Sequence, residues 1–169
     1  TRLLVHSKIV DEFTEKYLAK IKMISQGDPM NSKTEIGALI SKEHIEKVHK
    51  HVKDGISEGA ELLIGGEKLN NLAGYFYPPT VLKLKSTENI LFKEEIFGPV
   101  VAILPFDSEI EAIELANKTH YGLAGGIWTK DISKAIRVAK SIEAGYLWIN
   151  TYGGIIPETP YGGCLLYTS

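Results

Sequence analysis

Short apolar runs alternate with amphipathic stretches along most of this sequence, and this alternation restricts the fold more than any other feature. The apolar runs lie at residues 2–6, 59–66, 74–84, 100–106, 121–129 and 145–150. Between them, apolar residues recur at helical spacing, as at Ile45, Val48 and Val52. Strands that alternate with helices in this way indicate βαβ units. We therefore expect an α/β fold with a doubly wound, largely parallel sheet and flanking helices.

Charge and composition argue against several classes of protein. The chain has 169 residues and a net charge of -2, so it lacks the basic surface of a nucleic-acid-binding protein. No apolar run approaches the roughly 18 residues of a membrane span. The one cysteine, Cys164, cannot form an internal disulfide and fits a reducing compartment. We expect a soluble, cytoplasmic protein with no nucleic-acid or membrane partner.

Three features that suggest chemistry have simpler explanations. Cys164 lies in the run YGGCLLYTS, which offers no base to activate a thiol. His44, His49 and His51 lack the i, i+4 spacing of helical metal ligands, so we expect a solvated helix face and no metal site. The paired glycines match neither the dinucleotide-binding nor the P-loop pattern. We expect these pairs to form turns.

The segment at residues 93–101, KEEIFGPVV, is a stronger candidate. A short helix over roughly residues 88–95 is expected to end here. In one interpretation, Phe97 packs into the core at the helix terminus. In the other, Glu95 accepts hydrogen bonds from ribose hydroxyls while the ring of Phe97 covers a flat heterocycle. A carboxylate near a helix C-terminus is mildly unfavourable, which points to a role for Glu95.

An aromatic loop follows the last predicted strand, in the run WINTYGGIIPETPYGG. Its residues Tyr152, Ile155 and Tyr161 follow a strand end, where ligand sites of open α/β sheets lie. They either line an apolar mouth or pack within the loop. Glu158 in the same loop adds a carboxylate, and rings with a carboxylate suit a cationic ligand.

Five runs occur together in a fixed order: GYFYPPTVL, KEEIFGPVV, ANKTHYGLAGGIWTKD, AGYLWINTY and PYGG. With these runs, residues 1–163 resemble the NAD(P)-dependent aldehyde dehydrogenase superfamily. The resemblance implies an incomplete catalytic-domain fold, the C-terminal part of the catalytic domain, and an oxidoreductase that converts an aldehyde to a carboxylic acid. It further implies NAD or NADP as cofactor, bound mainly by an N-terminal domain outside this chain, and a parent that is a homodimer or homotetramer.

The same resemblance assigns roles to individual residues. Glu95 matches the glutamate that binds the nicotinamide ribose hydroxyls, and Phe97 matches the ring beside the nicotinamide. Tyr152, Ile155 and Tyr161 match positions at the aldehyde entrance. The nucleophilic cysteine, the general base and the oxyanion-hole asparagine of the family lie upstream, so we expect no catalytic residue in this chain and no activity from the chain alone.

The sequence departs from the family after PYGG. Residues 164–169, CLLYTS, replace a run that contains lysine and is rich in Ser and Gly, so we expect a foreign or frameshifted tail. Two alternatives to a dehydrogenase fragment remain open. One is a non-catalytic interaction or structural module, and the other is an acyl-phosphate reductase of the same superfamily.

Overall fold

The computed structural model describes residues 2–69 and 74–162, and the chain forms two compact units that meet at Phe106 and Asp107. The first unit contains β1 (Arg2–His6), η1 (Ser7–Ile9), α1 (Val10–Ile21), α2 (Lys42–Ser57), β2 (Glu61–Ile64), β3 (Thr80–Lys83), α3 (Ile90–Lys93) and β4 (Val100–Phe106). The second contains α4 (Glu109–Asn117), β5 (Ala124–Ile127), α5 (Ile132–Ser141) and β6 (Tyr146–Ile149). Cys164 and the expected tail lie outside the described residues.

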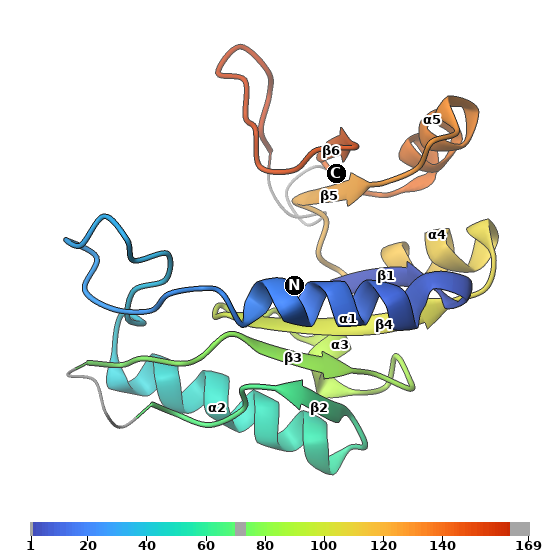
Figure 1. The fold of residues 1–169 in the computed structure, drawn as a ribbon. Helices are drawn as coiled ribbons and strands as arrows, with labels where there is room; N and C mark the ends of the chain where they lie inside the picture. The colour runs from blue at the N-terminus through green and yellow to red at the C-terminus, as the bar shows by residue number, and fades with distance from the viewer. Residues whose placement is uncertain (1, 70–73, 163–169) are drawn as a thin grey trace. The chain divides into compact units, whose positions relative to one another are not determined.

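The first unit is built on a four-stranded sheet with the strand order β1-β4-β3-β2 (Figure 1). Strand β4 pairs in parallel with β1 and with β3, in registers that place Leu3 beside Ile103 and Val81 beside Val101. Strand β2 runs antiparallel to β3 at the edge. Antiparallel neighbours need no crossover helix, and none occurs in the described part of the connection between β2 and β3. The predicted α/β fold with parallel strands and flanking helices is confirmed.

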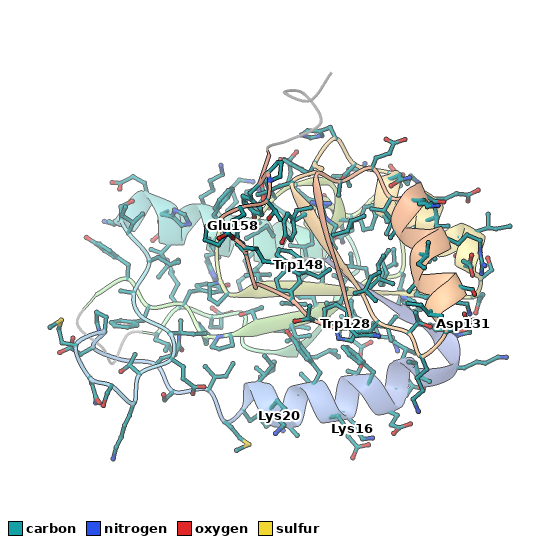
Figure 2. All side chains as sticks on the ribbon, turned by 90° about the horizontal axis from the view of Figure 1, so that it is seen from above. Lys16, Lys20, Trp128, Asp131, Trp148 and Glu158 are labelled. Carbon is teal, nitrogen blue, oxygen red and sulfur yellow. The ribbon has the colours of Figure 1, made fainter. Side chains whose placement is uncertain are left out.

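Helices cover both faces of this sheet (Figure 1). Helix α1 covers one face, where Val5, Val10, Val81 and Ile103 form a buried cluster. Its lysines Lys16 and Lys20 extend into solvent on the opposite side of the helix (Figure 2). Residues that alternate with the cluster along each strand point to the other face, which α2 and α3 cover. Those alternating residues are also buried, and they include Leu82, Leu84, Val100, Ala102 and Leu104.

Two of the strand predictions are wrong in detail. The apolar run at residues 59–66, which lies between glycines, predicts a buried strand, but it forms β2, which lies at the sheet edge and leaves Glu61 and Leu62 exposed. The strand predicted over residues 74–84 begins only at Thr80. Pro78 and Pro79 precede it and have no N–H to donate to a ladder. Thr80 makes the first hydrogen bond, from its N–H to the Pro99 carbonyl at 2.7 Å.

Side-chain caps set where the helices begin. Ser41 accepts a hydrogen bond from the N–H of His44, as its position ahead of α2 predicts. The spacing Ser108-x-x-Glu111 predicts a capping box at α4. Ser108 does accept from the N–H of Glu111, but the Glu111 carboxylate accepts from the N–H of Asp107, one residue before the cap, at 2.7 Å. Asp131, labelled in Figure 2, caps α5 in the same way. These signals are local, which is why the sequence alone locates them.

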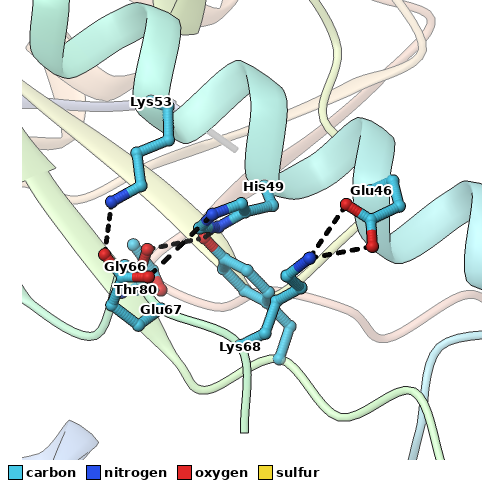
Figure 3. Close-up of polar contacts among 8 residues, drawn as sticks. Glu46, His49, Lys53, Gly66, Glu67, Lys68 and Thr80 are labelled. Carbon is cyan, nitrogen blue, oxygen red and sulfur yellow. Dashed lines mark hydrogen bonds and ion pairs between the residues drawn. The ribbon is translucent and has the colours of Figure 1, made fainter.

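A polar network fastens the segment after β2 to helix α2 (Figure 3). The buried Tyr77 hydroxyl donates to the Gly66 carbonyl at 3.1 Å and lies 3.2 Å from Nδ1 of His49. Burial raises the pKa of Tyr77 and lowers the pKa of His49, so both side chains are favoured in their neutral forms. Lys53 pairs with Glu67, and Lys68 pairs with Glu46. The prediction of a solvated helix face is therefore wrong for His49.

The second unit contains a parallel pair, β5 and β6, with helices α4 and α5. The helical spacing of Ile132, Ala135 and Ile136 predicts an apolar stripe on α5, but only Ala135 is buried and both isoleucines are exposed. The same kind of pattern predicts that Ile110 of α4 faces inward, and it is exposed instead. Two strands offer little area for a helix face to cover. In the described part of both units, the helices lack the length and apolar character of a membrane-spanning segment.

Candidate functional site

The segment that carries Glu95 and Phe97 is not helical. Helix α3 ends at Lys93, and Glu94 already has φ -97° and ψ 150°. The predicted helix over residues 88–95 is therefore too long, and Glu95 does not lie at a helix C-terminus. Ile96 is buried, while Glu95 and Phe97 are exposed on either side of it. The backbone turns tightly at Phe97, where the Gly98 N–H donates to the Ile96 carbonyl at 3.0 Å.

The exposure of Phe97 decides between the two interpretations of this segment. Its side chain is 68% exposed, and Ile96 occupies the place in the core that Phe97 would have taken. The interpretation that places Phe97 in the core is wrong. The exposed ring and the exposed carboxylate two residues before it are both accessible to a ligand.

Helix α2 supports this segment from behind. A ring nitrogen of His44, Nε2, contacts the Phe97 carbonyl, which requires that nitrogen to donate its proton. A Cβ on Gly98 would lie 3.0 Å from Cγ2 of Val48, so glycine allows the backbone to lie close against α2. The prediction of a solvated helix face is thus wrong for His44 as well. Its position just after the α2 cap gave no sequence signal of this contact.

Glu95 and Phe97 together suit one end of a nucleotide. A carboxylate accepts hydrogen bonds from vicinal ribose hydroxyls, and an exposed ring covers a planar heterocycle. An exposed carboxylate and an exposed ring two residues apart would therefore suit a ribose that carries a planar heterocycle. In the described residues there is no cluster of three or more His, Cys, Asp or Glu side chains that could hold a metal ion.

The second unit carries an aromatic cluster, defined here as Trp128, Tyr146, Trp148, Tyr152 and Tyr161. The ring of Tyr152 lies 4.7 Å from Trp148 and 6.4 Å from Trp128, measured between centroids. Tyr146 continues the row, at 4.8 Å from Trp148 and 5.5 Å from Tyr161. The structure therefore brings together two of the predicted pocket residues, Tyr152 and Tyr161. The rings of Trp148 and Tyr146, for which the sequence predicted no role, connect them.

Strand pairing explains how five large rings fit on one face. Tyr146 and Trp148 alternate along β6, and their partners on β5 are Ala124 and Gly126. A Cβ on Gly126 would approach the Trp128 ring to 2.6 Å and the Tyr152 ring to 3.1 Å. Small residues on β5 thus leave the space that the rings occupy.

The loop after β6 is anchored by an indole. Nε1 of Trp148 donates to the Gly154 carbonyl at 2.7 Å (Figure 2 labels Trp148, Trp128 and Glu158). Ile155 and Glu158 follow this anchor and are exposed. Ile155 is 50% exposed, and its place at the aldehyde entrance stays a prediction. Trp128 and Trp148 were missed because a tryptophan within a strand pattern is usually a core residue, although Trp128 is exposed.

Comparison with known proteins gives a consistent result. Residues 1–165 match the model of the Aldehyde dehydrogenase family. The chain is 43% identical over 166 residues to an aldehyde dehydrogenase of Vibrio cholerae, covering 96% of the chain and 33% of that protein. It is 44% identical to a betaine aldehyde dehydrogenase of Bacillus subtilis, covering 96% and 34%. For a 4-trimethylaminobutyraldehyde dehydrogenase of Oryzias latipes, the identity is 45%, covering 96% and 33%.

Solved structures agree with these matches. An NAD-dependent aldehyde dehydrogenase from Sinorhizobium meliloti superposes with a TM-score of 0.93 at 43% identity, over 96% of this chain and 32% of that one. A betaine aldehyde dehydrogenase from Staphylococcus aureus in complex with NAD+ gives a TM-score of 0.91 at 38% identity, over 96% and 33%. The chain therefore spans about a third of the length of the relatives it matches.

Proposed function

The chain belongs to the aldehyde dehydrogenase family, and we propose that it is part of an NAD(P)-dependent enzyme that oxidises an aldehyde to a carboxylic acid. The complete enzyme is this larger protein, of which the chain is a part. The observation that carries the proposal is that Glu95 and the ring of Phe97, two residues apart, are both exposed. The NAD-dependent relatives in the comparisons support the same cofactor class.

The residues of this chain hold and orient the nicotinamide end of the cofactor. Glu95 accepts hydrogen bonds from the ribose next to the nicotinamide, and Phe97 packs beside the nicotinamide ring. When bound, the cofactor accepts a hydride from the substrate carbon. His44 and Val48 keep the segment in place from behind. The thiol nucleophile and the base that activates water come, in this proposal, from the rest of the complete enzyme, as does most of the cofactor affinity.

The proposal is tested by comparing the complete enzyme with residues 1–163 alone. We expect the complete enzyme to reduce NAD+ or NADP+ when an aldehyde is added, with one carboxylic acid formed per reduced cofactor. Residues 1–163 alone should show no turnover and should not bind NAD+ at micromolar concentrations in calorimetry, because Glu95 and Phe97 reach only one end of the dinucleotide. A complete enzyme that forms no carboxylic acid from the aldehyde, and instead oxidises NADH or NADPH while it reduces an acyl phosphate to an aldehyde and phosphate, would contradict the proposal. Turnover by residues 1–163 alone would do so too.

A cationic aldehyde is the substrate class that the aromatic cluster favours. Electron-rich rings attract a quaternary ammonium group by about 0.5–2 kcal/mol at each favourable contact. The cluster holds five such rings in a row, of which Trp128, Tyr152 and Tyr161 are exposed and Trp148 is buried. Two relatives are named for aldehydes with a trimethylammonium group, betaine aldehyde and 4-trimethylaminobutyraldehyde. These points support a cationic substrate for the complete enzyme.

Replacing Tyr161 by Leu should reduce this preference. We expect kcat/KM for betaine aldehyde to fall about 3- to 30-fold relative to that for a neutral aldehyde of similar size, the range that one cation–π contact spans. Tyr75→Leu is a matched control, because Tyr75 is 42% exposed, Tyr161 is 43% exposed, and Tyr75 lies outside the cluster. An unaltered enzyme that prefers the neutral aldehyde would show that the cluster does not select for charge.

A further inference from the structure

The carboxamide of Asn150 extends the pairing of β5 and β6 beyond the ends of both strands. The last main-chain hydrogen bond runs from the Asn150 N–H to the Ile127 carbonyl at 2.8 Å. Beyond it, Oδ1 of Asn150 accepts from the Thr129 N–H at 3.0 Å, and Nδ2 donates to the Thr129 carbonyl at 3.0 Å. One side chain thus satisfies both main-chain groups of a single residue, as a neighbouring strand would.

The backbone of Asn150 makes this arrangement possible. Its φ of 55° is the single left-handed conformation among the non-glycine residues that the structure describes. Asparagine tolerates this conformation better than most side chains do. The left-handed turn ends the strand and directs the chain into the loop that carries Tyr152. The same residue therefore sets the direction of the loop through its backbone and fixes the opposite strand through its side chain.

The two sides of this clamp carry aromatic rings. Trp128 immediately precedes Thr129, and Tyr152 follows Asn150 by two residues. Their rings are stacked at 6.4 Å with an interplanar angle of 28°. The indole of Trp148 holds the far side of the loop through its bond to Gly154. Two sets of hydrogen bonds therefore determine where Tyr152 lies relative to Trp128. Asn150 bonds to Thr129 next to the strands, and Trp148 bonds to Gly154 on the far side of the loop.

We propose that Asn150 is a positioning residue for the aldehyde, because its bidentate bond to Thr129 holds Trp128 and Tyr152 in register as one binding surface. This inference rests on the proposed function, in which the aromatic cluster receives the substrate. Asn150 itself does not contact substrate. Its effect is expected on aldehyde binding, and cofactor binding should be unchanged.

Asn150→Gly in the complete enzyme separates the side chain from the backbone, since glycine accepts the left-handed conformation and makes neither hydrogen bond. We expect KM for the aldehyde to rise about tenfold, which corresponds to about 1.4 kcal/mol, with kcat and the NAD+ affinity within about twofold. The near-ultraviolet circular dichroism of the coupled rings should also change. Asn150→Asp keeps the oxygen that accepts from the Thr129 N–H but lacks the Nδ2 donor. Its KM for the aldehyde should therefore lie between those of the unaltered enzyme and Asn150→Gly.

Asn117 provides a matched control in the same unit. It also makes two side-chain bonds to the main chain, donating to the Ser141 carbonyl at 2.8 Å and accepting from the Glu143 N–H at 2.9 Å. Asn117→Ala should lower the melting temperature but leave KM and the aromatic spectrum unchanged. Equal changes of KM in both variants, or no change in Asn150→Gly, would overturn the inference. An unchanged aromatic spectrum in Asn150→Gly would overturn the inference whether or not the complete enzyme oxidises aldehydes. A complete enzyme that oxidises no aldehyde would separately contradict the proposed function.

Discussion

Replacing Glu95 by Gln in the complete enzyme is expected to slow hydride transfer on the order of a hundredfold, because a misplacement of about 1 Å in the reacting geometry has a cost of that size. In the proposed function, the carboxylate fixes the ribose, and the ribose fixes the angle of the nicotinamide. Gln keeps the size of the side chain but replaces one acceptor oxygen with a donor. Overall NAD+ affinity should change less than the rate, since most contacts lie elsewhere on the dinucleotide. Stopped-flow measurement of the first turnover separates the two effects.

Glu94→Gln is the matched control for this experiment. Glu94 is adjacent and exposed, and its N–H makes the last hydrogen bond of α3, to the Ile90 carbonyl at 2.9 Å. The same chemical change at this position should leave hydride transfer within about twofold, because a substitution at an exposed position outside the site has little effect. An unchanged first turnover in Glu95→Gln, or an equal loss in both variants, would show that Glu95 does not orient the nicotinamide.

Gly65→Ala is expected to destabilise the first unit by about 4 kcal/mol. Gly65 has a φ of 76°, a conformation that costs an alanine about 1–2 kcal/mol. Its Cβ would lie 2.5 Å from the Pro79 carbonyl oxygen and 2.9 Å from Cα of Thr80, so buried backbone must move, at a cost of about 1–3 kcal/mol. The shift also disturbs the Thr80 hydroxyl, which accepts from the Gly66 N–H at 2.9 Å.

Gly59→Ala distinguishes backbone strain from the steric clash. Gly59 has a φ of 94°, and its Cβ would have nothing within 4 Å. Its replacement should therefore cost only the strain, about 1 kcal/mol. Hydrogen-exchange mass spectrometry of the peptides that contain β2 and β3 measures both changes in the complete enzyme. Similar losses of protection in the two variants would mean that the packing around Gly65 yields more easily than the structure indicates.

Several features of this protein followed from the sequence because neighbouring residues determine them. The caps at Ser41, Ser108 and Asp131 depend on a side chain and an N–H three residues away. The apolar periods located β1, β4, β6 and the main helices, and the alternation of strands with helices indicated the α/β fold. The runs that carry the resemblance likewise identified the family that the comparisons show.

Other features depended on contacts between distant parts of the chain. The antiparallel direction of β2 is set by its pairing with β3 at the edge of the sheet. The two tryptophans of the aromatic cluster, and the contact of His44 with Phe97, gave no signal in the local pattern. The short extent of α3 was missed because the run of residues up to Glu95 does not show where the backbone becomes extended.

The sequence by itself determined the family, the order of most elements and the residue types available for a nicotinamide site. The tertiary structure decided which of those side chains face solvent. Ile96 and Phe97 could each have taken the core position in the pattern, and packing within the first unit assigns it to Ile96, which leaves the ring outside. Similarly, only the parallel pairing of β5 with β6 brings Thr129 within hydrogen-bonding reach of the Asn150 side chain. Local propensity fixes what a segment can form, whereas burial and pairing are properties of segments in contact.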